Sequence, residues 1–169
     1  MGEAAKLYDD DFLTWAERQA SELRALSARP DLSNIMDWDN LIEEVEALGR
    51  HEWKTVRSKL VLSLMHLIKG VADPSSLSMA AWASETAFFF LDAREDHRRS
   101  MNAFLEPDKL WRDACSRAAV SLKEYGVALP TDLPQNSPFT LAQLLDPELQ
   151  FDNGVSQIKL HMPPPLLLA

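Results

Sequence analysis

The chain has 169 residues, of which 46% are hydrophobic and 25% are charged, and its formal net charge is −9 at pH 7. This length and composition are typical of one globular domain that buries a core without disulfides or structural metals. A negative chain repels phosphate backbones, so we expect no nucleic-acid partner. Cys115 is the only cysteine, which excludes an intramolecular disulfide and a thiolate metal cluster.

The expected location follows from the same features. The sequence opens without the charged and apolar regions of a signal peptide. No uncharged apolar run reaches the roughly 20 residues that span a bilayer. A single cysteine also fits a reducing compartment. We therefore expect a cytoplasmic protein without a membrane partner.

The first predicted helix starts within YDDDFLTW, residues 8–15, and ends at the segment ARPDLSN. Three consecutive aspartates favour the positive end of its dipole. Its apolar positions recur every three or four residues and predict one buried face. That face comprises Phe12, Ala16, Gln19, Leu23 and Leu26.

Residues 37–70 predict one long helix. Asp37 can cap its N-terminus, and the apolar stripe crosses Gly49 without a change of phase, so we expect no break there. At about 1.5 Å per residue the helix would be roughly 50 Å long. After Lys59 it is apolar nearly all round, which indicates a central, buried element. The stripe consists of Ile42, Val45, Trp53, Val56, Leu60, Leu64 and Leu67.

Two further long helices are predicted after Pro74. The third covers about residues 78–105, with a stripe of Trp82, Thr86, Phe90, Ala93, Met101 and Phe104. The fourth begins at Pro107, a residue suited to the first helical turn. Its apolar face carries Trp111, Cys115, Ala118 and Leu122, so Cys115 is interpreted as a small core residue.

The C-terminal segment is rich in proline. Residues 125–138 predict an extended linker, and Thr140 with Gln143 forms the pattern of a capping box, with Phe139 able to staple onto Leu144. A short helix near residues 140–146 is therefore expected. Residues 151–162 predict either a hairpin or an irregular segment.

These elements predict an all-α fold, an antiparallel bundle of about four main helices around one long central helix. We expect residues 1–125 to form the bundle. Residues 126–169 would form an extended segment with one short helix, packed on the bundle or on a partner subunit.

His66 lies within the apolar half of the long helix, in the sequence LVLSLMHLIKG. At about 100° per residue, Lys59, Ser63 and His66 share a polar seam with Glu52 beside the apolar stripe. One interpretation is a half-buried histidine bonded to Ser63 or to another helix. The alternative is a ligand or general base, with Ser63 as a second weak catalytic candidate.

His97 falls on the predicted buried stripe of the third helix, where it would need a partner such as His66 or Glu44. The sequence has neither E-x-x-H nor H-x-x-x-H spacing, the patterns of bundle metal sites. The geometrically conceivable metal site joins His66 and His97 with Asp92 or Asp96. We expect no cofactor.

A mixed-charge face on the long helix is the predicted interaction surface. Glu43, Glu46, Arg50 and Lys54 lie on its outer side, where a solvated face is the simpler interpretation. Phe89 belongs to three consecutive phenylalanines that cannot all enter one core. A second packing layer or a dimer would cover the remaining ring.

Three blocks resemble the bacterial family of domains of unknown function numbered 29: residues 7–24, residues 37–70 with Pro74 and Trp82 downstream, and residues 137–146. The resemblance covers about residues 7–150 and implies a small, all-helical, cytosolic bacterial protein without an established activity. The family pattern matches Asn40, Glu43, Glu44, Glu46, Gly49, His66 and Lys69. This chain has Phe89 and Phe90 where members carry a polar Gln-Arg pair.

The sequence indicates a non-catalytic protein-interaction or adaptor module that binds another protein or itself. The alternative is a hydrolase-like enzyme or metal-binding protein centred on His66 and His97. A second alternative is an antitoxin-like or regulatory partner of a neighbouring gene product.

Overall fold

The computed structural model describes residues 3–32 and 36–163. In order, its helices are α1 (Glu3–Asp10), α2 (Phe12–Ser27), α3 (Trp38–Ala72), α4 (Met79–Asp96), the 3-10 helix η1 (Arg99–Phe104), α5 (Pro107–Lys123), α6 (Leu141–Leu144) and α7 (Phe151–Leu160). Over these described ranges no strand is present. The all-α prediction with a long central helix is therefore confirmed. Contacts divide the chain into two compact units, Met1–Thr55 with Asp96–Phe104 and Val56–Glu95 with Leu105–Ala169, called unit 1 and unit 2.

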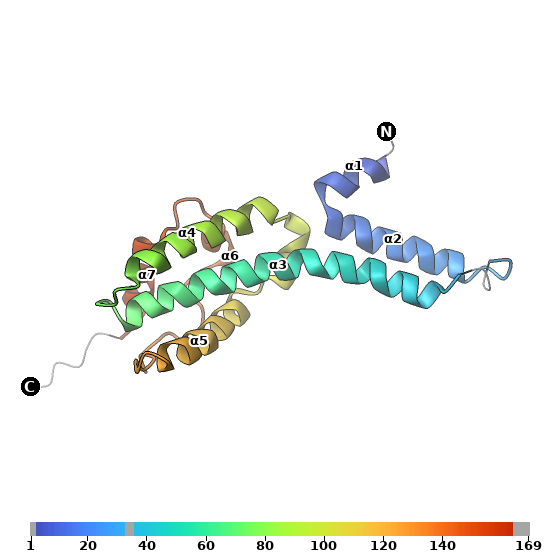
Figure 1. The fold of residues 1–169 in the computed structure, drawn as a ribbon. Helices are drawn as coiled ribbons and strands as arrows, with labels where there is room; N and C mark the ends of the chain where they lie inside the picture. The colour runs from blue at the N-terminus through green and yellow to red at the C-terminus, as the bar shows by residue number, and fades with distance from the viewer. Residues whose placement is uncertain (1–2, 33–35, 164–169) are drawn as a thin grey trace, which may run out of the picture. The chain divides into compact units, whose positions relative to one another are not determined.

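Unit 1 contains α1, α2, η1 and the N-terminal half of α3, and Figure 1 shows α2 running alongside this half of α3. Asp11 caps α2 by accepting a hydrogen bond from the backbone of Thr14 at 3.0 Å. A Cβ atom built at Gly49 would lie 3.0 Å from the Cβ of Ala16, so the glycine permits close packing of α2 on α3. Gly49 thus serves helix packing and leaves α3 unbroken, as predicted.

Two predictions for unit 1 are wrong. The buried face of α2 consists of Leu13, Ala16 and Ala20, whereas Leu26 is exposed. The face is therefore turned from the predicted one, because α2 packs small residues against Gly49. In addition, α1 forms a separate helix before Asp11, within residues for which no helix had been expected.

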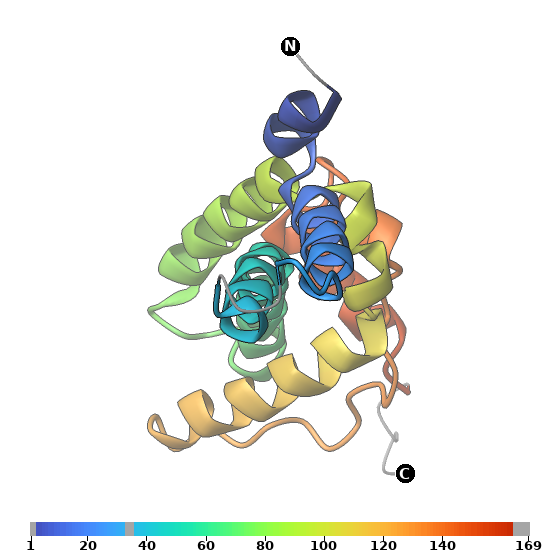
Figure 2. The same ribbon diagram turned by 90° about the vertical axis from the view of Figure 1, so that its right-hand side faces the viewer.

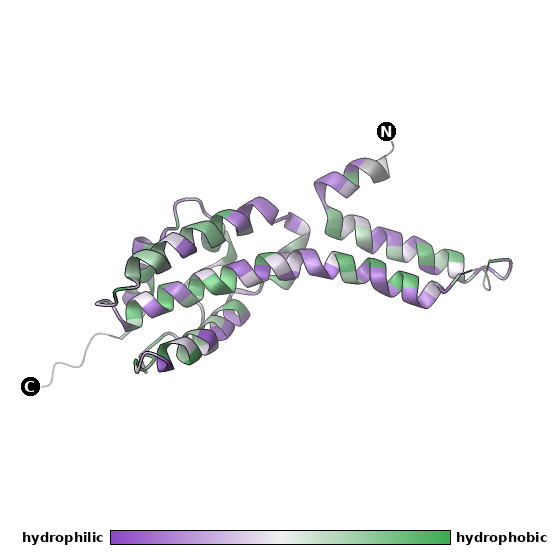
Figure 3. Ribbon diagram, viewed as in Figure 1, coloured by the Kyte–Doolittle hydropathy of each residue, from purple (hydrophilic) through white to green (hydrophobic). Residues whose placement is uncertain are grey.

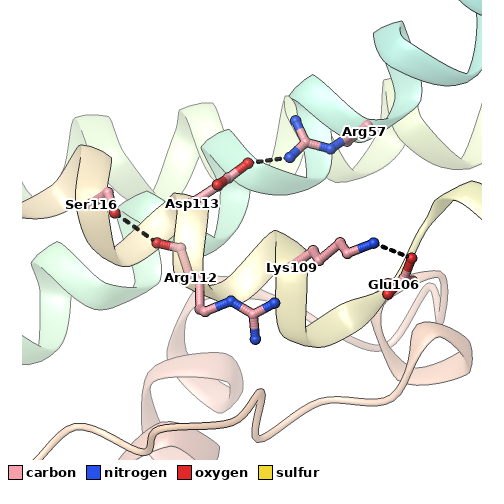
Figure 4. Close-up of polar contacts among 6 residues, drawn as sticks. All are labelled: Arg57, Glu106, Lys109, Arg112, Asp113 and Ser116. Atoms are coloured by element: carbon pink, nitrogen blue, oxygen red, sulfur yellow. Dashed lines mark hydrogen bonds and ion pairs between the residues drawn. The ribbon is translucent and has the colours of Figure 1, made fainter.

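Unit 2 is built around the C-terminal half of α3, and Figures 1 and 2 show α4 and α5 on different sides of it. Leu60, Leu64 and Leu67 on α3 are fully buried, as are Phe90 on α4 and Leu110 on α5. Figure 4 shows Arg57 of α3 directed at Asp113 of α5, with which it forms an ion pair. A hydrophobic centre with ion pairs at its edge is the expected anatomy of a helical bundle.

Helix α7 replaces the hairpin or irregular segment expected after residue 150, so that prediction is wrong. A Cβ atom at Gly70 would lie 2.6 Å from the ring of Phe151, and one at Gly154 would lie 2.8 Å from Leu67. Glycine on each helix therefore lets α3 and α7 approach closely. Glycine disfavours helix interiors in isolation, and the close approach of Gly154 to Leu67 offsets that preference here.

Hydrogen bonds from the helices hold the C-terminal segment on unit 2. Trp111 donates to the Pro134 carbonyl at 2.7 Å, and Gln157 donates to the Pro138 carbonyl at 2.7 Å. The capping box of Thr140 and Gln143 is present at the start of α6, as predicted. The segment therefore follows the surface of its own unit.

Helix α4 ends at Asp96, so the predicted continuous helix over residues 78–105 is wrong in its last third. Acidic residues crowd its last turn, Glu95 and Asp96 among them, where the helix dipole disfavours negative charge. The chain continues as η1, whose helical spacing explains why the sequence pattern ran on without a break. Met101 is buried, as its position in the stripe had indicated.

Candidate functional site

The polar seam of α3 faces α4 throughout unit 2. Lys59 Nζ lies 2.7 Å from Asp92 Oδ2, and His66 Nε2 lies 2.9 Å from Glu85 Oε2. One turn further, the Lys69 ammonium lies 4.4 Å from the centre of the Trp82 ring. As the residue number rises along α3, the number of its partner on α4 falls by the same amount. The three contacts therefore belong to one antiparallel register of the two helices. We call Lys59, His66, Lys69 and their three partners the α3–α4 seam.

His66 is held by this seam as a buried, neutral imidazole. Its side chain is 5% exposed, and its ring stacks at 6.0 Å on Phe89. Burial, reinforced by the positive charge of Lys69, lowers the pKa of His66 to about 4, against a smaller raising effect of Glu85. At neutral pH the contact is therefore a hydrogen bond from Nε2–H to the Glu85 carboxylate, rather than an ion pair.

The geometry of His66 does not favour proton transfer to a substrate. Nε2 is engaged by Glu85, and Nδ1 is buried without a hydrogen-bond partner in the described residues. A general base needs an open nitrogen within reach of the proton that it removes. The catalytic role of His66 stays a prediction, and this arrangement gives it no support.

Lys69 adds a buried cationic group beside the neutral His66. It is 5% exposed, and burial lowers its pKa while Glu85 acts in the opposite direction. The face of the Trp82 ring attracts its ammonium, an interaction worth about 1–2 kcal/mol where water is excluded. Glu85 thus accepts a hydrogen bond from His66 and also acts electrostatically on Lys69, which makes it central to the seam.

The remaining catalytic and metal candidates are dispersed. Ser63 donates to the carbonyl of Lys59 at 3.1 Å, so its hydroxyl does not bond to His66. His97 follows the end of α4 and lies 2.7 Å from the Asn102 Oδ1 atom, instead of in a buried stripe. Asp96, the last residue of α4, is exposed. Within residues 3–32 and 36–163 no three His, Cys, Asp or Glu side chains gather as metal ligands would.

The predicted charged surface is found on unit 1. Glu43, Arg50 and Lys54 are exposed, while Glu46 forms ion pairs with Arg24 and, at 3.8 Å, with Arg50. A groove of about 520 Å³ is lined by Arg24, Ser27, Asp39, Ile42, Glu43, Glu46 and Arg50. The positive and negative side chains of the groove largely compensate one another, so the groove has no strong preference for a positively or a negatively charged ligand.

The three phenylalanines of α4 have different environments. Phe90 is fully buried, Phe89 packs on His66 and under the Lys59 ammonium, and Phe88 is 64% exposed. Phe89, named above for the interaction surface, therefore packs against two residues of the seam, His66 and Lys59. The exposed ring is Phe88, which sequence reasoning could not distinguish from its neighbours.

Sequence reasoning also missed Glu85 as the partner of His66. A usable signal was present, because Lys59 and His66 are seven residues apart and so are Glu85 and Asp92. Equal spacings of opposite polar groups on antiparallel helices place both pairs in contact at once. The spacing is hard to recognise in the sequence of α4, because its acidic residues stand among apolar ones.

This architecture, with helices throughout the described residues and a polar seam between α3 and α4, is that of an all-helical bundle protein. Residues 7–150 match the model of the family described as Domain of unknown function DUF29, and the chain belongs to this family. The resemblance noted in the sequence is thus confirmed. A search of curated proteins gives no match.

A solved structure has the same fold. It is an α-helical protein of unknown function from Rhodospirillum rubrum, with 28% sequence identity and a TM-score of 0.79. The alignment covers 89% of this chain and 96% of the other. Neither likeness names an activity. Among the described helices, none combines the length and apolar character that crossing a membrane requires.

Proposed function

We propose that this protein is a non-catalytic interaction module of the bacterial cytoplasm and that the outer face of α4 binds its partner. The observation that carries the proposal is the exposure of Phe88 and Leu91, at 64% and 57%. Around them, Ala80, Ala81, Ser84 and Ala87 are also exposed. This set of six residues is called the α4 face.

An exposed apolar face is unusual on a helix that packs in a bundle, as α4 does. Between Met79 and Leu91, α4 carries Glu85 as its single charged residue, and a helical segment so rich in apolar residues is normally buried. Yet α4 buries only Trp82, Thr86, Phe90 and Ala93. In Figure 3 hydrophobic colour recurs along α4, and hydrophilic colour is strongest at its C-terminal end. Contiguous exposed apolar residues mark interaction sites, whereas single ones are ordinary.

Two comparisons within the chain strengthen this interpretation. Val120 on α5 is 70% exposed, but its neighbours Ser116, Arg117, Ser121 and Glu124 are polar, so it stands alone. The charged groove of unit 1 pairs Glu46 with arginines of its own chain. The α4 face has no partner of that kind among the described residues.

Leu91→Lys tests the proposal, with Val120→Lys as a matched control of similar exposure. Tagged wild-type protein and both variants are used to capture polypeptides from source-cell lysate, and captured chains, including untagged copies of this protein, are quantified by mass spectrometry. We expect at least one polypeptide that wild type and Val120→Lys retain and that Leu91→Lys loses several-fold. Equal capture by all three proteins would contradict the proposal. Circular dichroism verifies that the variants are folded.

A further inference from the structure

We infer that the partner of the α4 face is a second copy of this chain, bound through an antiparallel, two-fold pairing of the α4 helices. This inference rests on the proposed function and names its partner. It follows from how large and small side chains are distributed over the face. Bulky residues occupy the C-terminal part, Phe88 and Leu91, and alanines occupy the N-terminal part, Ala80 and Ala81.

The helical positions show which side chains would meet. At about 100° per residue, Phe88 and Ala81 lie about 40° and 60° to one side of Ser84. Leu91 and Ala80 lie about 20° and 40° to the other side. A two-fold axis that makes helices antiparallel brings together residues on the same side of the face. Phe88 would then pack on Ala81 of the second copy, and Leu91 on Ala80 of the second copy.

The residues near the two-fold axis also suit this pairing. With the axis near residue 85, the side chains centred on the crossing are Ser84 and Ala87, both small, while the exposed Glu85 lies about 100° to one side of Ser84. Small residues at a crossing allow two helices to approach closely enough for large side chains to fill the opposite hollows. An isologous interface requires this self-complementarity of a single surface. A partner of unrelated sequence would not account for it.

The carboxylate nearest the axis belongs to Glu85, which accepts a hydrogen bond from His66 and interacts electrostatically with the Lys69 ammonium of its own chain. The Lys69 charge offsets part of the repulsion between the two Glu85 carboxylates at the contact. Each copy nevertheless has a net charge of −9, so two copies repel at long range. Salt screens such repulsion. Added salt should therefore strengthen self-association, whereas it would weaken the binding of a basic partner.

The size of the face sets the expected affinity. Residues 80–91 span about 16 Å along the helix axis, which is too short to bury the ~1,200 Å² of a stable interface. We expect a reversible dimer with a dissociation constant in the micromolar range. Its dependence on concentration distinguishes it from a permanent oligomer.

Sedimentation equilibrium of the purified full-length chain, from about 1 µM to 1 mM, tests the inference. We expect a monomer–dimer equilibrium that added salt strengthens. Ala80→Glu and Leu91→Lys should each weaken dimerisation at least about tenfold, and Val120→Lys should leave it unchanged. The double variant Ala80→Glu/Leu91→Lys should recover several-fold of the loss. The two substituted residues are about 16 Å apart on one helix and meet only across the two-fold axis.

Three outcomes would overturn the inference: a monomer at 1 mM, dimers that both single variants leave intact, or a double variant that associates no better than the weaker single variant. A monomer combined with Leu91-dependent capture of a different polypeptide would refute the second copy and retain the proposed function. Loss of that capture specificity would refute the proposed function itself.

Discussion

Acidification should lower the free energy of unfolding of this protein through protonation of His66. Folding lowers the pKa of His66 from 6.5 to about 4, chiefly because the imidazole is buried. Between these values the unfolded chain binds more protons at residue 66 than the folded chain does. The free energy of unfolding therefore falls as the pH decreases from about 6.5 to 4, and the contribution of neutral His66 is complete above that range.

The magnitude follows from the two pKa values. A difference of one pKa unit corresponds to 1.36 kcal/mol, so linkage assigns about 2–3 kcal/mol of lost stability to His66 at pH 4.5. The side chain is 5% exposed, so solvent screening reduces this figure little. Such a loss is a substantial fraction of the ~5–15 kcal/mol that stabilises a typical domain.

Urea unfolding at pH 7 and pH 4.5, followed by circular dichroism, measures the effect. His66→Gln should lose less stability between the two pH values than wild type, by about 2 kcal/mol. His51→Gln, an exposed position on the same helix, should behave like wild type. Glu85→Gln should lose nearly as much as wild type over this range, because the pKa of His66 already lies below pH 4.5 and a further decrease changes the loss by only about 0.2 kcal/mol. Equal pH dependence in wild type and His66→Gln would refute the reasoning.

Three further measurements test the packing of unit 2. Gly70→Ala should lower the free energy of unfolding by about 1–3 kcal/mol in urea titrations, because its Cβ would lie 2.6 Å from the Phe151 ring. A stable Gly70→Ala protein with unchanged unfolding would contradict the close approach of α3 and α7. Burial raises the pKa of Cys115 to about 11, so iodoacetamide at pH 8 should label the native thiol far more slowly than the urea-unfolded one; equal rates would argue against its burial. Thr140→Ala should cost about 1 kcal/mol by removing the cap of α6, and Thr140→Ser should preserve it.

The long helix and its buried half could be predicted from the sequence because packing and pattern agree there. The apolar stripe across Gly49 kept its phase, and Val56, Leu60 and Leu64 are fully buried. Two short-range patterns were also predictable, Pro107 at the start of α5 and the capping box of α6. Each depends on neighbours along the chain, so tertiary structure does not need to be known.

Most of the wrong predictions concern features that depend on contacts between segments distant in the sequence. Glycine disfavours a helix when only its sequence neighbours are considered, yet α7 forms because Gly154 fits against Leu67 of α3. His97 follows the end of α4 without a glycine or proline to mark the break. The exposure of Phe88 rather than Phe89 depends on the rotation of α4 about its axis. Contacts between distant segments decide the formation of α7 and the rotation of α4, whereas the end of α4 has a local signal in the acidic residues of its last turn.

The α3–α4 seam explains how that rotation is fixed. Sliding α4 by four residues along α3 would place Lys59 opposite Phe88 and His66 opposite Ala81, leaving polar groups unpaired. An unpaired buried donor costs about 1–3 kcal/mol, so the shifted register is less stable than the observed one. The same register turns Phe88 and Leu91 outward and thereby creates the α4 face. The seam is therefore interpreted as a positioning device, and its polar residues as determinants of specificity.

Reversing one pair of the seam tests this role. Lys59→Asp would place two carboxylates together, and Asp92→Lys would place two ammonium groups together, so each single variant should lose stability. The double variant restores an ion pair of opposite orientation. Because the native pair is 30% and 44% exposed, the coupling energy from a double-mutant cycle should be modest, about 0.5–1 kcal/mol. A coupling indistinguishable from zero, with both single variants as stable as wild type, would show that apolar packing alone sets the register of α4.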